Sequence, residues 1–168
     1  MRDYLDQVRR VAQTDLYYLT LGAALVIPDM CSGLEAADGR TTGALYQAWF
    51  DRHVAHKYVA AGGPSFSGED CYGLRCAMLH QGRLEPHKGI YTRILFIEPH
   101  GGMTLHNNVM NDALNIDVTR FALDMVESAE QWLTAAEQTS QYQSNFPRYM
   151  QRYPQGLAPY IVGIPVIT

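Results

Sequence analysis

Two residues five positions apart, Arg75 and His80, are the strongest candidates for chemistry in this sequence. They lie in an apolar segment that is predicted to be a helix ending at Gly82. A buried cation needs an anionic partner or a functional role, because an unpaired charge in apolar surroundings is very costly. A histidine near a helix C-terminus is biased toward its protonated form by the helix dipole, which suits proton transfer near neutral pH.

An arginine and a histidine together suit metal-independent cleavage of RNA. That reaction removes a proton from a ribose 2′-hydroxyl, stabilises extra negative charge on the phosphate and protonates the leaving oxygen. The planar guanidinium can hold phosphate oxygens, and the imidazole can carry out either proton transfer. Positions five apart on a regular helix diverge by about 140°. A shared pocket therefore requires the helix end to relax or a second subunit to contribute.

A structural interpretation of the same pair stays open. Arg75 could pair with a core carboxylate such as Asp29, Glu35 or Asp51, while His80 caps backbone carbonyl groups. Both side chains reachable from solvent in one cleft across a dimer axis would favour the nuclease. An Arg75 that is salt-bridged within one subunit would favour a non-catalytic module.

Other polar groups near the pair have weaker patterns. His53 and His56, with Cys76 and His80, could be assembled into a zinc site, but the spacing matches no closed zinc pattern. We therefore interpret the first two histidines as a solvated helix end, and we expect neither a metal nor a cofactor. Four basic residues could border a polyanion groove or simply form an ordinary polar surface: Arg52, Lys57, Arg83 and Lys88.

The helix that carries the pair has the clearest start signal in the chain. Ser67 and Asp70 fit a capping box, and Phe66 is placed to act as the flanking hydrophobic staple. At 100° per residue, Arg75 falls in the middle of an apolar arc. We therefore expect this helix to be enclosed on most sides, as a central helix would be.

Three helices are predicted before it from hydrophobic periodicity. The first covers about 2–13, and the second covers about 14–37 with Thr14 or Asp15 as its cap and a kink at Pro28. The third begins near Thr42. Its inner face is expected to contain Leu45, Trp49 and Phe50.

A long amphipathic helix is predicted after Asp117, which is placed to cap it. Between the helices, the β-rich run 91–97, the glycine turn 100–103 and two short extended pieces predict a hairpin or small sheet over about 90–116. The inner face of the long helix is expected to contain Phe121, Met125, Ala129, Trp132 and Ala136.

The end of the chain is predicted to contain a short piece near 148–153 and an extended apolar tail over 154–168. The tail has the pattern of a strand, or of a strap over an exposed surface at a subunit contact. The predicted fold is therefore mainly α: one domain over 1–168, with four to six helices and a small β insertion.

Composition limits the classes of function. The chain has 168 residues, 47% of them hydrophobic, which is enough for one core. Its formal net charge of −4 provides no global field for nucleic acid, so a polyanion site must be local. Three cysteines, Cys31, Cys71 and Cys76, predict a reducing cytoplasm, and the early acidic residues lead us to expect no secretory signal. The apolar run 16–27 is too short to span a bilayer and predicts a buried helix.

With its capped apolar helix, the helices that precede it and the pair Arg75 and His80, the chain resembles the HEPN superfamily. These compact α-helical domains often act as metal-independent ribonucleases in prokaryotic conflict, plasmid or phage systems. Their signature is an arginine followed four to six residues later by a histidine, on a late helix of the bundle. The resemblance covers about 1–140 and implies a homodimer with the motif at its axis. Active members usually have a polar residue after the arginine, where this chain has Cys76.

The resemblance implies an endoribonuclease-like domain in which Arg75 holds phosphate and His80 exchanges protons. It also implies RNA as substrate, a cytoplasmic homodimer with no membrane contact, and an antitoxin or other protein as a further partner. The alternative is a non-catalytic helical dimer module that binds a protein or nucleic acid and keeps Arg75 as a structural charge.

Overall fold

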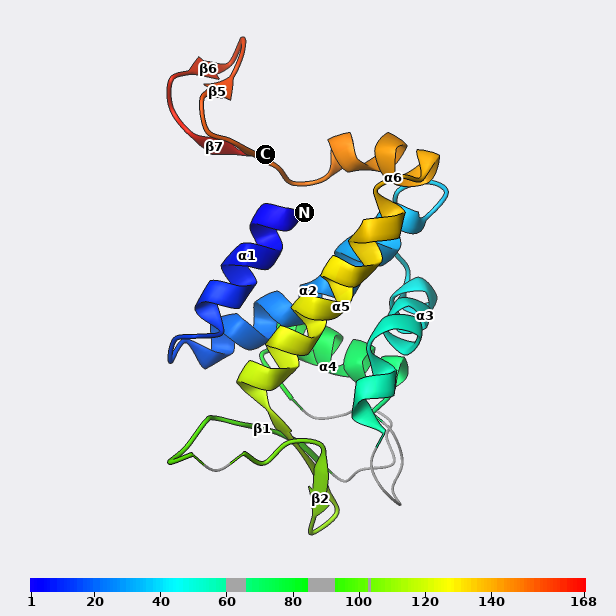
Figure 1. Ribbon diagram of the computed structural model, residues 1–168, viewed down its shortest axis with the longest axis vertical. Coiled ribbons are helices and arrows are strands. Elements are labelled where there is room, and N and C mark those ends of the chain that lie inside the picture. The colour runs from blue at the N-terminus through cyan, green and yellow to red at the C-terminus, as the bar shows by residue number, and fades with distance from the viewer. Residues whose placement is uncertain (60–65, 85–92, 103) are drawn as a thin grey trace.

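The protein is mainly α, as predicted. The computed structural model describes residues 1–59, 66–84, 93–102 and 104–168, and the arrangement of their elements is drawn in Figure 1. The helices in these ranges are α1 (Arg2–Val11), α2 (Tyr17–Glu35), α3 (Gly43–His53), the 3-10 helix η1 (Ala55–Tyr58), α4 (Gly68–Gln81), α5 (Val118–Ala136), α6 (Ser140–Asn145) and the 3-10 helix η2 (Phe146–Arg148).

The central helix is α2, and not α4 as the sequence suggested. Helix α2 packs against each of the other five α-helices in the described ranges. On α4, the buried positions are all in its first half: Gly68, Asp70, Cys71 and Leu74. In the second half of α4, Met78 is only partly buried and Leu79 is exposed. The prediction of an enclosed α4 was therefore wrong.

Helix α2 has the length and composition of a membrane-spanning helix, since it continues to Glu35 beyond the apolar run recognised in the sequence. In the structure, 61% of this apolar stretch is buried inside the protein. The expectation of a buried helix was confirmed, although the expected cap was not. Leu16 is the N-cap, and no side chain caps this end of α2.

Helix α3 begins after Thr42, near its predicted start, and α5 begins at its predicted cap, Asp117. The Thr42 side chain accepts a hydrogen bond from the backbone N–H of Leu45, and the Asp117 side chain accepts one from Arg120. All of the residues predicted for the inner face of α5 are buried. On α3, however, Leu45 is exposed and Tyr46 is buried in its place. Tyr46 lies three and four positions before the two buried aromatic residues of this helix, so it shares their face.

The region predicted as a β insertion contains a three-stranded sheet in the order β1-β3-β2. Strands β2 (Asn108–Met110) and β3 (Ala113–Asp117) form an antiparallel hairpin. Its turn contains Asn111 and Asp112, which both have positive φ. Strand β1 (Arg93–Ile97) pairs with β3 in parallel, so the glycine turn at 100–102 does not close a hairpin. Residues 91, 92 and 103 of the predicted segments, and the loop 61–64, lie outside the described residues.

The last part of the chain forms a projection that we call the C-terminal arm, residues 152–168. Strands β4 (Arg152–Tyr153) and β7 (Val166–Ile167) pair antiparallel, as do β5 (Gly156–Leu157) and β6 (Ile161–Val162). The arm points away from the helices at the top of Figure 1 instead of covering them as a strap. The short piece expected near 148–153 is helical and lies earlier, as α6 and η2. Thr139 caps α6, and this was the signal that could have located it.

Candidate functional site

Arg75 pairs with a carboxylate of its own chain. Its Nε atom donates a hydrogen bond to Oδ2 of Asp29, at 2.7 Å, from α4 to the central helix α2. The side chains are 21% and 12% exposed, so the pair lies at the edge of the core. The sequence had left three carboxylates as possible partners. Of these, Glu35 is bonded to Arg52 and Trp132, and Asp51 accepts from the backbone of Gly68.

His80 lies on the other side of the same guanidinium. Nη1 of Arg75 is 3.1 Å from Nε2 of His80. Because arginine can only donate, Nε2 of His80 is the acceptor, and the proton of the neutral ring is on Nδ1. Helix α4 stays regular to Gln81, so its end does not relax to bring the two side chains together. The long arginine side chain reaches His80 instead.

Helix α4 ends at Gly82, as the sequence predicted, and backbone hydrogen bonds fix this end. Gly82 has φ 63° and ψ 28°, a left-handed conformation that favours glycine. The N–H groups of Gly82 and Arg83 donate to the carbonyls of Met78 and Ala77. This pattern closes the helix directly after His80 and leaves its imidazole exposed.

Asp29 directly follows Pro28, a proline inside α2. Pro28 has no N–H, so the Ala24 carbonyl lacks its usual helical donor. Two tyrosine hydroxyls donate to the carbonyls on either side: Tyr4 to Ala23 at 2.8 Å and Tyr46 to Leu25 at 2.9 Å. Helices α1 and α3 therefore brace the segment of α2 that presents the carboxylate.

The surroundings of Asp29 make its charged form expensive. Burial raises the pKa of Asp29, and the hydrogen bond and charge of Arg75 offset this only in part. Its second oxygen, Oδ1, is buried and has no partner among the described residues. The Asp29 carboxylate therefore depends on Arg75, because this guanidinium is its principal source of compensation.

Cys76 follows Arg75 and is half-buried. Its thiol is hydrogen-bonded with Tyr72, which raises the pKa of that tyrosine, and with the Arg75 guanidinium. The position where the resemblance expects a polar residue is thus part of the polar group around Arg75.

An apolar surface adjoins the pair. We call Tyr18, Leu19 and Leu79 the α2/α4 patch, with exposures of 81%, 63% and 42%. A Cβ on Gly22 would lie 4.0 Å from Cδ2 of Leu79, so the end of α4 packs on the Gly22 face of α2. Tyr18 and Leu19 lie one turn earlier on that face of α2. The patch and the Arg75–His80 pair therefore share one side of the molecule.

The other candidates from the sequence do not join this site. In the described ranges, no group of three or more His, Cys, Asp or Glu side chains could hold a metal ion. His53 contacts Trp49 with tilted rings, whose centroids are 5.0 Å apart, while His56 is exposed. Of the predicted basic border, Arg52 is paired with Glu35, and Lys57 with Asp124 and Glu127. Lys88 lies outside the described residues.

A second polar cluster was missed from the sequence. Asp124, on the buried face of α5, has a side chain that is only 2% exposed. It accepts hydrogen bonds from Arg120 at 2.8 Å, from the Tyr58 hydroxyl at 3.1 Å and from Lys57 at 3.3 Å. The sequence contained one signal of this cluster: Asp124 is an acidic residue between two core positions of an amphipathic helix.

His106 contacts this cluster from the segment between β1 and β2. Its Nε2 is 3.8 Å from Asp124, while its Nδ1 is buried and has no partner in the described part of the chain. Burial lowers the pKa of His106, although Asp124 and Asp117 act in the opposite direction. The cluster therefore holds η1, α5 and the sheet region together through one buried carboxylate.

Comparison with protein-family models, curated proteins and solved structures finds no match for this chain. The resemblance to the HEPN superfamily thus rests on the sequence alone, through Arg75, His80 and the predicted order of the helices.

Proposed function

We propose that this protein is a non-catalytic helical module that dimerises and binds a protein or nucleic acid, with Arg75 as a structural charge. The observation that carries this proposal is the 2.7 Å salt bridge between Arg75 and Asp29 within one subunit. The bridge neutralises the arginine locally, which leaves little net charge to attract a phosphate. The same guanidinium donates to Nε2 of His80 and occupies the lone pair that a general base would use.

The α2/α4 patch supplies the contact surface in this proposal. Exposed apolar side chains that cluster beside polar groups are typical of interaction sites. A two-fold contact through Tyr18, Leu19 and Leu79 would bury the same patch on both subunits. It would also bring two Arg75–His80 pairs close to the axis.

The dimer is tested with a charge placed in the patch. Leu19→Glu is expected to lower the mass in light scattering to half of the parental value or less, without a change in circular dichroism. Leu45→Glu is the matched control, because Leu45 is 40% exposed on α3, away from the patch. A monomeric parent protein, or a mass that Leu19→Glu leaves unchanged, contradicts the patch as the contact.

A second candidate is the RNA-cleaving HEPN-type function, favoured by the direct contact between Arg75 and an exposed His80. An RNA phosphate that binds the Nη atoms of Arg75 would displace His80 and free Nε2 to accept a proton from the 2′-hydroxyl. Asp29 would then hold the guanidinium in place through Nε. In a dimer, two histidines would be available for the two proton transfers.

The two candidates differ in an RNA degradation assay. The parent protein, His80→Ala and the control His56→Ala are compared for cleavage of total RNA and for growth arrest on expression. The module proposal expects no cleavage by any of them. Cleavage by the parent and the His56 control, lost in His80→Ala, would overturn it in favour of the nuclease. Equal cleavage by all three proteins would remove His80 from any mechanism.

A further inference from the structure

The C-terminal arm has an unusual composition for an exposed segment. From Tyr153 to Thr168 the chain contains no Asp, Glu, Lys, Arg or His, whereas 18% of the whole sequence is Asp, Glu, Lys or Arg. The arm nevertheless exposes large apolar side chains: Tyr160 at 85%, Val162 at 75%, Ile164 at 56% and Ile167 at 64%. Each exposes on the order of 100 Å². Together they expose roughly 400 Å² of apolar area, which is comparable with the largest apolar patches on monomers.

The architecture of the arm also requires a covering surface. Its two ladders, β4 with β7 and β5 with β6, each pair only two residues per strand. A ribbon of two short strands is marginal in water unless it packs against something. The arm touches the helices only at its root and then points into solvent (Figure 1).

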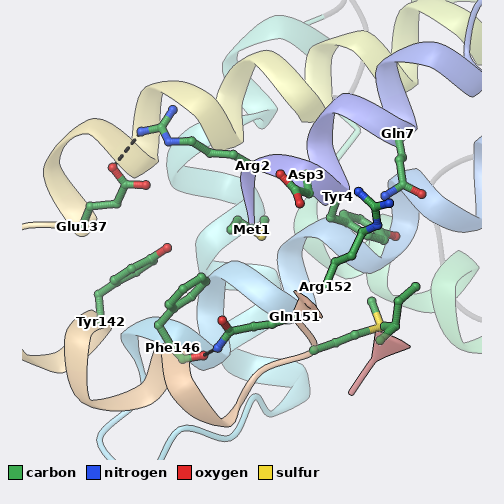
Figure 2. Close-up of a pocket in the computed structure, with 12 residues that line it drawn as sticks. Met1, Arg2, Asp3, Tyr4, Gln7, Glu137, Tyr142, Phe146, Gln151 and Arg152 are labelled. Carbon is green, nitrogen blue, oxygen red and sulfur yellow. Dashed lines mark hydrogen bonds and ion pairs between the residues drawn. The ribbon is translucent and has the colours of Figure 1, made fainter. Parts of the chain in front are cut away.

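A pocket of suitable chemistry lies at the root of the arm. It has a volume of about 540 Å³ and lies between α1, the end of α5, α6 and the base of the arm (Figure 2). Tyr142 and Phe146 stack in its wall, with centroids 5.3 Å apart and planes 12° apart. Arg2 and Glu137 at its border are paired with each other at 2.7 Å. Its apolar lining consists of Met1, Tyr4, Tyr142, Phe146, Met150 and Ile167.

We propose that the tip of this arm, residues 160–164, packs into the root pocket of a second copy of the chain, and that the exchange is reciprocal. Two arms laid side by side and antiparallel place each tip against the other root. This arrangement has two-fold symmetry and buries the apolar arm tip and the apolar pocket of both chains. It is independent of the α2/α4 patch, which lies on other elements. One contact alone gives a dimer, whereas both together give an assembly of more than two chains.

The area of contact fits a second copy. An arm that contributes roughly 400 Å² of side-chain surface, with a much smaller area from the pocket wall, buries about 500 Å² on each chain, or about 1,000 Å² in all. That is near the lower limit for a specific interface. The composition of the arm argues against a lipid bilayer as its binding partner. Segments that bind membrane surfaces combine apolar with basic side chains, and the arm from Tyr153 onward has no basic side chain.

Cross-linking between differently labelled chains tests the proposal directly. Tyr160→Cys at the tip and Gln7→Cys at the pocket border are made in separate chains, both with Cys76→Ser; the remaining cysteines, Cys31 and Cys71, are buried. After mild oxidation, the mixture is expected to form a disulfide-linked heterodimer, in which mass spectrometry finds the tip peptide of one chain joined to the α1 peptide of the other. The control pair, Leu45→Cys with Gln7→Cys, is expected to remain unlinked. A tip pair that links no better than the control overturns the proposal.

Solution mass provides a second test that does not depend on cysteine. Val162→Asp changes an exposed side chain, so the fold is expected to persist, while the assembly loses at least half of its mass in sedimentation. The Leu45→Asp control keeps the parental mass. An unchanged mass for Val162→Asp overturns the exchange. Binding of the parent to neutral phosphatidylcholine vesicles that is lost in Val162→Asp would overturn it as well, in favour of a lipid surface.

Discussion

Nη1 of Arg75 lies 3.1 Å from Nε2 of His80, while Nε of the same guanidinium lies 2.7 Å from Asp29. The arginine therefore connects an exposed imidazole to a carboxylate on the central helix. A change at Asp29 should reach His80 through this connection. The pair predicted from the sequence, Arg75 and His80, is therefore part of a group of three residues that includes Asp29.

The salt bridge gives the first prediction. Arg75→Met removes the cation and leaves the Asp29 carboxylate at the edge of the core, so the free energy of unfolding should fall by about 2 kcal/mol. The double variant Asp29→Asn/Arg75→Met should lose less than Arg75→Met alone, because it leaves no uncompensated charge. Urea unfolding of the four proteins of this double-mutant cycle measures the coupling, expected to be about 1 kcal/mol. Strict additivity would show that the bridge makes no net contribution.

The buried carboxylate of Asp124 gives the second prediction. Asp124→Asn removes the buried anion that Lys57 and Arg120 share, and we expect the protein to lose about 3 kcal/mol of stability. Glu127→Gln is the comparison, because the Glu127 side chain is 37% exposed and pairs with the same two cations. Its loss should be about 0.5 kcal/mol. Thermal unfolding separates the two variants, and similar losses would contradict the importance of burial.

The third prediction concerns pH and His106. Burial lowers the pKa of His106 below its usual 6.5 in the folded protein, so the unfolded chain binds more protons as the pH falls through that value. The contribution of His106 to stability should therefore decrease from pH 6.5 downward. His106→Gln should flatten the dependence of unfolding free energy on pH between about 6.5 and 5. The exposed His56 provides the control, and a His56→Gln curve that flattens equally would refute this assignment.

Two glycines of α4 give the fourth prediction. A Cβ on Gly68 would overlap the backbone of Gln47 on α3, so Gly68→Ala should destabilise the protein by about 1–3 kcal/mol. A Cβ on Gly73 would meet nothing within 4 Å. Gly73→Ala should therefore stabilise the protein by about 0.5–1 kcal/mol, because alanine is the better helix former. Opposite shifts of the melting temperature confirm this difference, and shifts of the same sign contradict it.

Features that depend on neighbouring residues could be predicted from the sequence. The Ser67–Asp70 capping box, the stop at Gly82 and the cap at Asp117 are all present, because each is a local hydrogen-bond pattern. The inner face of α5 was predicted for the same reason, since one periodicity determines which side of a helix is apolar.

Features that depend on distant pairing could not be predicted. The parallel register of β1 and β3 is not encoded in either strand by itself, so a hairpin was the simpler expectation. The partner of Arg75 had to be one of three carboxylates, and the choice of Asp29 depends on how α2 and α4 pack. The role of Asp124 could not be recognised, because its partners come from segments more than sixty residues earlier, as well as from its own helix.

The carboxamide of Asn145 donates to the carbonyls of Leu34 and Ala36 at the end of α2, at 3.1 and 2.8 Å. These carbonyls were synthesised more than a hundred residues before their donor. During synthesis, the carbonyls at the end of the central helix therefore lack this side-chain donor until α6 has left the ribosomal exit tunnel. A nascent chain stalled before that point would expose unbonded backbone at the C-terminus of α2, which would make this stage vulnerable to proteases and chaperone-dependent.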